Sequence, residues 1–361
     1  MSTGSEEGGA LRSILPPSRV DDLFGFCGDH AWALLGVGAV VGTLPPVFGL
    51  REGYYMTVLT EMYLFAILAL SWDLVGGQTG YPSFGNMAFF GIGAYTTAIL
   101  VKDVGIAFPV AMVGAGLVAV GFASVIGIAV LRLRGHYFAI ATLGVLLAAQ
   151  QVSRVLDITG GASGKILLDV PPGTAFYYLF FGLLIVEMGL VYYLSNTRFG
   201  FVLNAIRDDE EKATAMGFNT TYYKTAAWML AALFTGAAGG GYSLFNTFID
   251  PQTAYNGAWN VELIAMALIG GTGTVAGPVI GAFGLHTIIE IVETAFVGWQ
   301  LVILGAAVIV TVVGFPKGVV GSLGEYAGEM EYYKRGGMAA GGGEAAPGPE
   351  PDAEPEVEAG E

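Results

Sequence analysis

The sequence predicts an all-α polytopic membrane protein with about ten transmembrane helices and one short cytoplasmic helix between two of them. Three observations lead to this fold class. Apolar residues make up 54% of the chain and charged residues only 12%, and the mean hydropathy is +0.64. Several apolar runs also reach the roughly 20 residues that a helix needs to cross the hydrocarbon core. Such runs are typical of membrane-spanning helices.

Ten apolar segments are predicted to span the membrane. In chain order they cover residues 31–48, 55–75, 82–101, 108–131, 137–156, 175–194, 225–245, 260–276, 277–297 and 299–315. The segment 260–276 is short and ends among glycines and Pro278, which is typical of a broken or re-entrant helix. Glycines inside other spans predict a close approach of helix backbones.

Basic residues decide the predicted orientation. With both chain ends in the cytoplasm, eleven of the fifteen Lys and Arg residues face the cytoplasm and four face outward, in line with the positive-inside rule. This arrangement requires that 260–276 crosses the membrane fully, so a full crossing is favoured over re-entry. The predicted location is the cell membrane, as a multi-pass protein with both termini cytoplasmic.

Composition divides the chain into three regions. Residues 1–30 are a predicted cytoplasmic N-terminal segment, residues 31–320 the transmembrane domain with a polar loop at 195–224, and residues 325–361 an acidic tail. The tail has too few large apolar side chains to offset its chain entropy and is expected to be disordered. The net charge of −15 suggests a halophilic proteome, because acidic surfaces stay hydrated at high salt.

The sequence lacks the residue patterns of an enzyme. It has no G-x-x-x-x-G-K-[ST] motif to cradle ATP phosphates, and its three histidines and single Cys27 form no ligand cluster. Gly271-Thr-Gly273-Thr-Val-Ala276 matches a dinucleotide fingerprint only superficially, because no soluble strand precedes it. We therefore expect no catalytic residue, no cofactor, no metal site and no nucleic-acid partner.

Polar residues inside the apolar segments are candidates for lining a pathway, because a charge at membrane depth normally faces the bundle interior or a wet cavity. The candidates are Gln78, Ser83, Asn86, Glu262, His286 and Glu290, and further intramembrane acids are Glu61, Asp73, Glu187 and Glu293. His286, Glu290 and Glu293 recur at helical spacing on one face. Three roles are open for these residues: they line a pathway, they lie in the headgroup zone, or they relay protons.

The largest charged island, residues 197–217, lies between two apolar segments. Asp208 is predicted to be the N-cap of a short helix, with Glu211 three residues later completing a capping box. Asp209 and Glu210 also suit the positive end of the helix dipole. The sequence thus predicts a helix of about two turns, flanked by one basic residue on each side of its acids, Arg207 and Lys212.

The residues in the second half of the predicted helix indicate where the helix ends and which face makes contacts. Ala213 and Met216 are expected on one face, and Gly217 can take the left-handed conformation that ends a helix. Two turns are too few to be stable alone, so the helix is expected to dock on another surface. The alternative is a capped helix in a loop without a partner.

At these residues the chain resembles the permease subunits of branched-chain amino-acid ABC importers, of the LivM type. Arg198-Phe-Gly200, Ala205-Ile-Arg-Asp-Asp-Glu210 and Ala215-Met-Gly217 are similar to that family's cytoplasmic loop. Further similar segments follow in family order across residues 55–320: Gly80-Tyr-Pro-Ser-Phe-Gly85, Ala88-Phe-Phe-Gly-Ile-Gly-Ala-Tyr95, Gly135-His-Tyr-Phe-Ala-Ile-Ala-Thr-Leu143, Ile269-Gly-Gly-Thr-Gly-Thr-Val-Ala-Gly-Pro278 and Phe315-Pro-Lys-Gly318. Asn86-Met87 departs from the family, which often has His or Gln followed by Ala there.

The resemblance implies a pore-forming subunit without ATPase activity of its own. The implied partners are two ABC ATPase subunits, a homologous second permease, an extracytoplasmic solute-binding protein and the lipid bilayer. The implied ATPase-coupling residues are Arg207, Asp208, Asp209, Glu210, Glu211, Ala213, Met216 and Gly217. Related permeases carry urea, short amides or other amino acids, so the substrate stays open within the group. A proton-coupled secondary transporter that uses His286, Glu290 and Glu293 is the competing class.

Overall fold

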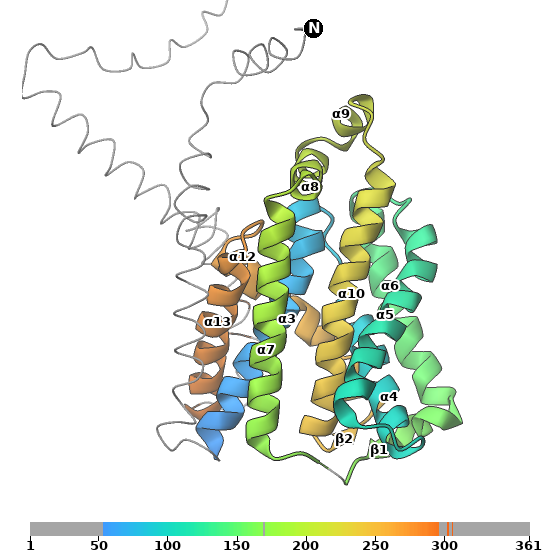
Figure 1. Cartoon of the computed structure of the whole chain (residues 1–361), viewed down its shortest axis with the longest axis vertical. Helices are drawn as coiled ribbons and strands as arrows, with labels where there is room; N and C mark the ends of the chain where they lie inside the picture. The colour runs from blue at the N-terminus through green and yellow to red at the C-terminus, as the bar shows by residue number, and fades with distance from the viewer. Residues whose placement is uncertain (1–52, 169, 296–301, 303–304, 306–361) are drawn as a thin grey trace, which may run out of the picture. The chain divides into compact units, whose positions relative to one another are not determined.

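The computed structural model describes residues 53–168, 170–295, 302 and 305. Within them the chain forms eleven α-helices, two short 3-10 helices and one two-stranded ladder (Figure 1). The all-α fold class is therefore confirmed for this part of the chain. The predicted segment 1–30, the span 31–48 and the tail 325–361 lie outside the described residues, as does the span 299–315 apart from Val302 and Gly305.

In the part of the chain that the structure describes, four helices are long and apolar enough to cross a membrane: α3 (Tyr54–Thr79), α5 (Phe108–Val130), α6 (His136–Val155) and α7 (Gly173–Ser195). α10 (Thr220–Phe245), with 26 residues, runs alongside them (Figure 1). Each of the five coincides approximately with one predicted span. The helices thus support a polytopic bundle, but the number of ten spans is not confirmed.

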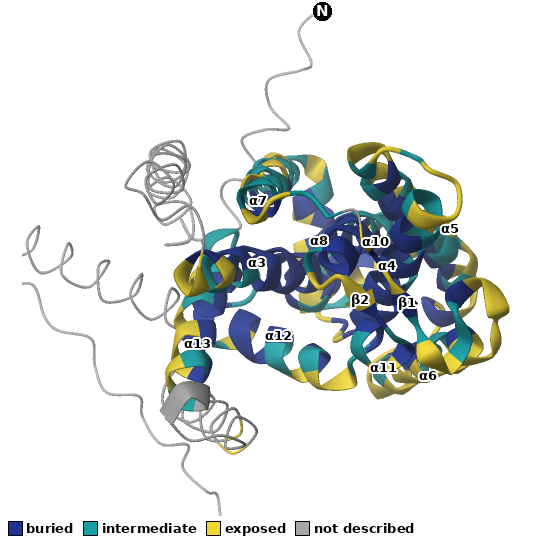
Figure 2. Cartoon of the chain, turned by 90° about the horizontal axis from the view of Figure 1, so that it is seen from below, coloured by how far each residue is buried: buried dark blue, intermediate teal, exposed yellow. Residues whose placement is uncertain are grey.

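The helices differ sharply in how much of their surface the protein covers. α3 is almost enclosed: 83% of an apolar 18-residue stretch of this helix is buried, whereas only 22% of the corresponding stretch of α6 is buried. Figure 2 shows α3, α4 (Asn86–Lys102) and α10 buried at the centre and the exposed faces on the outer helices. Because many of the large exposed side chains of α5 and α6 are Val, Leu and Ile, these faces suit contact with lipid.

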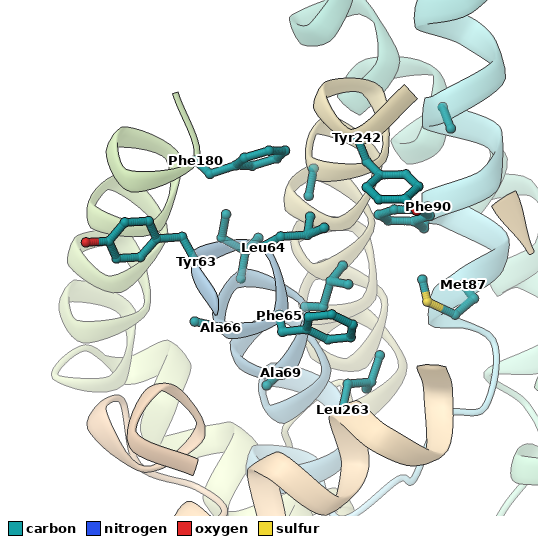
Figure 3. Packing of buried hydrophobic residues seen from close by; sticks show 14 of the residues in the cluster. Tyr63, Leu64, Phe65, Ala66, Ala69, Met87, Phe90, Phe180, Tyr242 and Leu263 are labelled. Atoms are coloured by element: carbon teal, nitrogen blue, oxygen red, sulfur yellow. The ribbon is translucent and has the colours of Figure 1, made fainter. Parts of the chain in front are cut away.

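Aromatic and aliphatic side chains from separate helices fill the core around α3 (Figure 3). The rings of Phe90 and Tyr242 lie 5.4 Å apart, and Phe65 lies 5.3 Å from Trp259. Glycines bring the backbones of α4 and α10 together: a Cβ on Gly93 would lie 1.9 Å from the carbonyl oxygen of Gly236. The predicted close approach of helices at small residues is confirmed here.

α12 (Gly257–Gly270) is shorter than the predicted span 260–276. Its 14 residues extend about 21 Å, less than the roughly 30 Å of a hydrocarbon core. The helix ends at Gly270, and the next residue, Gly271, has a φ of 118° that favours glycine. α13 (Ala276–Ala295) then packs back against α12. The predicted helical span 260–276 is therefore wrong for residues 271–275, which form a turn.

The bundle has two distinct ends (Figure 1). α8 (Arg198–Asp208) and α9 (Glu210–Ala215) lie at one end. At the other end β1 (Lys165–Ile166) pairs antiparallel with β2 (Phe248–Ile249), just before the four-residue helix α11 (Pro251–Ala254).

Candidate functional site

The charged island folds into two helices instead of the single predicted one. Thr197 caps α8, with its hydroxyl accepting from the amide of Phe199 at 3.3 Å. Asp209 caps α9 and accepts from the amides of Glu211 and Lys212 at 3.0 and 3.1 Å. The predicted N-cap was Asp208, which is wrong by one residue. Asp208 completes α8, whereas Asp209 is extended, with φ −163°, so that its carboxylate can turn back to the helix start.

α8 is an amphipathic helix that docks on the bundle. Val202, Leu203 and Ile206 are buried, and their spacing of three and four residues places them on one face. The sequence reasoning missed this helix, although the apolar spacing and the Thr197 cap could have revealed it.

The end of α9 agrees with the prediction at one residue and differs at another. Gly217 has φ +88° and donates to the carbonyl of Thr214 at 2.9 Å, so the predicted left-handed end is confirmed. Ala213 is fully buried, but Met216 is 60% exposed. Their predicted common face is wrong, because the α-helix ends at Ala215 and Met216 leaves the buried side.

Glu210 anchors α9 to the bundle. Its carboxylate accepts from Lys224 Nζ at 2.6 Å and from the hydroxyl of Tyr81. The Lys224 ammonium also lies 4.3 Å from the centre of the Tyr81 ring. Burial alone would raise the pKa of Glu210, but the hydrogen bonds from Lys224 and Tyr81 outweigh it and keep that pKa below its usual value.

The neighbouring acids are held more loosely. Glu211 pairs with Arg134 at 3.1 Å, and both side chains are largely exposed. Asp209 pairs with Lys212 at 3.1 Å, and the backbone amide of Lys212 lowers the pKa of the Asp209 carboxyl. Exposed pairs of this kind contribute little stability, so the connection of α9 to the bundle rests on Glu210.

Arg207 connects α8 to the end of α3. Its Nη1 donates to the carbonyl oxygen of Gly77 at 3.1 Å. The predicted coupling residues are therefore gathered at one end of the bundle, and three of them, Arg207, Glu210 and Glu211, bond to residues of other helices and loops.

The first group of predicted pathway residues lies in the last turn of α3 and in the residues that come after it in the chain. Gln78, Ser83 and Asn86 are all buried. Gln78 Nε2 lies 3.5 Å from the hydroxyl of Ser195, and Ser83 Oγ accepts from the amide of Gly85 at 3.2 Å. The side-chain amide of Asn86 has no hydrogen-bond partner among the described residues.

Asn260, which the sequence reasoning missed, joins this group to α12. Its Nδ2 donates to the carbonyl of Phe84 at 2.9 Å, and its Oδ1 lies 3.4 Å from the amide of Met87. Asn260 is 1% exposed. The unwound residues 80–85 before α4 are thus tied to the first turn of α12. The signal in the sequence was a single amide within an apolar run.

The second group lies on α3 and α13. His286 Nε2 lies 3.8 Å from Glu61 Oε2, and Tyr54 donates to Glu290 at 2.6 Å. Suitable ligand atoms of Glu61, His286 and Glu290 lie within 4.8 Å of one another, so among the described residues they are a donor set for a cation or a shared proton. The predicted closeness of His286 and Glu290 is confirmed.

The two groups do not form one continuous site. Glu61 and Gln78 are 17 residues apart on α3, or about 25 Å along the helix axis. Glu262 is partly exposed on α12, and the side chain of Glu293 lies outside the described set. Another predicted intramembrane acid, Glu187, is buried against the Ser71 hydroxyl at 2.6 Å.

Comparisons with known proteins give one consistent result. Residues 54–312 match the family model described as "Branched-chain amino acid transport system / permease component". The chain is 26% identical to a high-affinity branched-chain amino acid transport system permease protein, LivM of Salmonella typhimurium, over 73% of this chain and 69% of that protein. No solved structure matches.

Two proteins of Methanocaldococcus jannaschii are also similar. Its probable branched-chain amino acid transport permease LivM is 25% identical over 62% of this chain and 77% of that protein. Its probable permease LivH is 24% identical over 61% of this chain and 74% of that protein.

Proposed function

The chain belongs to the family of branched-chain amino acid transport system permease components, and from that premise we propose that it is the LivM-type pore subunit of an ATP-driven importer. It is a multi-pass membrane protein and not itself an enzyme. The substrate that we propose is a branched-chain amino acid, as the names of its relatives state for those proteins. Urea and short amides are the alternatives.

ATPase and binding-protein partners are implied by the family. We propose two ATPase subunits, an extracytoplasmic solute-binding protein and a second, homologous permease that completes the pore. Similarity to both LivM and LivH proteins of one organism supports a pairing of two related permeases. Because the binding protein selects the substrate, the pore needs to hold it only weakly.

The observation that carries the proposal is the anchored and yet outward-facing α8–α9 segment. Its inner side is fixed by the buried Lys224–Glu210 pair and by the apolar face of α8. Phe201 of α8 and Met216 at the end of α9 are each exposed by more than half, as is Tyr222 in the first turn of α10. Exposed apolar groups beyond the end of a bundle suit a protein partner, and the anchor would pass that partner's movement to the helices. We place this end in the cytoplasm, as the positive-inside rule favours.

The test is a purification of the full chain in mild detergent from cells that also express its neighbouring transport genes. We expect two ATPases and a second permease to be recovered with it in a fixed stoichiometry. Recovery of the folded chain without any ATPase, combined with uptake that needs no ATP, would overturn the proposal. The ligand bound by the copurified or neighbouring binding protein then identifies the substrate.

A proton-coupled transporter is the second candidate, supported by the cluster of Glu61, His286 and Glu290. It predicts uptake by this chain alone in vesicles with a pH gradient. Uptake that depends on ATP hydrolysis and not on the gradient excludes it.

A further inference from the structure

Asp73 is a carboxylate that is completely buried near the end of α3. Both of its oxygens accept from the same backbone amide, that of Gly273, at 2.9 and 3.1 Å. Gly273 belongs to the turn between α12 and α13, so Asp73 fixes this turn to α3. One amide cannot replace the hydration of a carboxylate, and a buried charge of this kind requires an opposite charge nearby.

Arg207 of α8 brings a positive charge to the same backbone contact. Its Nη1 donates to the carbonyl of Gly77 and lies so close to Gly273 that a Cβ there would come within 2.3 Å of it. A Cβ on Gly77 would in turn lie 1.8 Å from Asp73 Oδ1. The guanidinium and the carboxylate therefore border the same contact between Gly77 and Gly273.

Glycines make room for this arrangement. A Cβ on Gly80 would lie 3.4 Å from Arg207 Cγ, and Gly80 and Gly273 both have positive φ, at 73° and 78°. Side chains at Gly77 or Gly273 would fill the space that the carboxylate and the guanidinium use. The backbone of α3 and of the α12–α13 turn is thus shaped around the Arg207 side chain.

We propose that Asp73 and Arg207 are positioning residues that couple the docking of α8 to the conformation of the α12–α13 turn. If α8 moves away, Asp73 loses its countercharge while it stays buried, so the docked helix and the closed turn stabilise each other. The turn directly follows α12, whose Asn260 holds residues 80–85 and the start of α4. Movement of α8 then reaches the unwound segment beside Asn86. The energy source for this movement rests on the proposed function, but the coupling is a property of this chain alone.

The first experiment uses the purified full chain in nanodiscs and measures amide hydrogen exchange. In Arg207→Gln and in Asp73→Asn we expect the Gly273 amide to exchange about tenfold faster or more, as the loss of a hydrogen bond to a charged group predicts. Arg132→Gln, which removes an exposed charge at the end of α5, is the matched control and should leave this amide unchanged. Unchanged exchange at Gly273 in Arg207→Gln overturns the proposal.

The double variant Asp73→Asn with Arg207→Gln guards against misfolding. If Arg207→Gln does not fold because Asp73 is left unpaired, removal of the carboxylate should restore a folded protein. Equal failure of the double variant would contradict the electrostatic link. In a double-mutant cycle the two changes should also be clearly non-additive, and additive effects count against the proposal.

The second experiment uses the complete transporter in proteoliposomes and measures substrate imported per ATP hydrolysed. A merely structural defect lowers both rates together, whereas a broken link lowers the ratio, which we expect to fall several-fold in Arg207→Gln and Asp73→Asn. An unchanged ratio together with faster exchange at Gly273 overturns the role in transport and leaves the permease function intact. Absence of ATP-driven import by the wild-type complex refutes the proposed function instead, and the exchange result is independent of it.

Discussion

Lys224, at the start of α10, places its ammonium 2.6 Å from the carboxylate of Glu210, the first residue of α9. The Lys224 side chain is 3% exposed and that of Glu210 12%. Lys224 therefore has little access to water, and Glu210 and the Tyr81 ring are the groups that stabilise its charge.

The first prediction concerns this pair. Glu210→Gln leaves a buried ammonium without its carboxylate and should destabilise the chain by about 3 kcal/mol, seen as a lower midpoint of thermal unfolding in detergent. Glu211→Gln is the matched control, since it breaks only the exposed pair with Arg134 and should cost less than about 1 kcal/mol. Equal unfolding midpoints for both variants would show that the buried pair contributes no more to stability than the exposed pair.

The second prediction concerns the outer face of the α8–α9 segment. Met216→Asp should abolish copurification of the ATPases and ATP-driven uptake, while the chain still inserts and unfolds at the wild-type temperature. The reason is that Met216 is 60% exposed, so the change alters a docking surface and not the core. The control is Ile158→Asp, which changes an apolar residue that is 58% exposed and lies in a 3-10 helix outside α8 and α9. This variant should keep the ATPases bound. ATPase binding by Met216→Asp at wild-type strength would contradict the docking surface.

The third prediction separates the positive φ of Gly217 from the hydrogen bond of its backbone amide. Proline cannot adopt φ +88° and removes the amide that donates to Thr214, so Gly217→Pro should cost about 3 kcal/mol locally and abolish uptake. Gly217→Ala keeps the amide and should cost only about 1 kcal/mol, with reduced but measurable uptake. Initial uptake rates in reconstituted vesicles should fall in the order Gly, Ala, Pro. Equal rates for Ala and Pro would argue against the left-handed turn.

The fourth prediction concerns the contact between the two interrupted segments. Asn260→Ala removes the donor to Phe84 and the acceptor near Met87 and should lower the free energy of unfolding by about 2 kcal/mol. Asn256→Ala is the comparison, because it removes only the side-chain cap at 3.0 Å from Ala258, worth about 1 kcal/mol. Only Asn260→Ala should speed amide exchange in residues 84–88. Similar exchange in both variants would show that Asn260 does not hold this segment.

The sequence predicted well those features that repeat along one helix. Apolar runs located the long helices, and Gly217 marked a left-handed helix end, because both depend on local residue types. Asp208 and Asp209 show the limit of such reasoning, since two adjacent acids are equally good caps and only the packing of Val202, Leu203 and Ile206 decides where α8 ends. Asp73, Asn260 and Lys224 act through partners that are 14 to 200 residues away. A single sequence contains no signal for such pairings.

The fifth prediction separates the two transport classes at Glu290. Glu290 accepts from Tyr54 at 2.6 Å and lies beside His286 and Glu61, so a proton-coupled mechanism would need its carboxylate. In the importer mechanism Glu290→Gln keeps the acceptor oxygen for Tyr54, and ATP-driven uptake should stay within about twofold of wild type, a difference worth about 0.4 kcal/mol. Uptake should also continue when an ionophore collapses the pH gradient. The control is Lys224→Met, which should stop ATP-driven uptake in the same vesicles because it breaks the anchor of α9. If Glu290→Gln and the ionophore each stop uptake while ATP is supplied, the Glu61–His286–Glu290 cluster moves protons and the purely mechanical account of the permease is wrong.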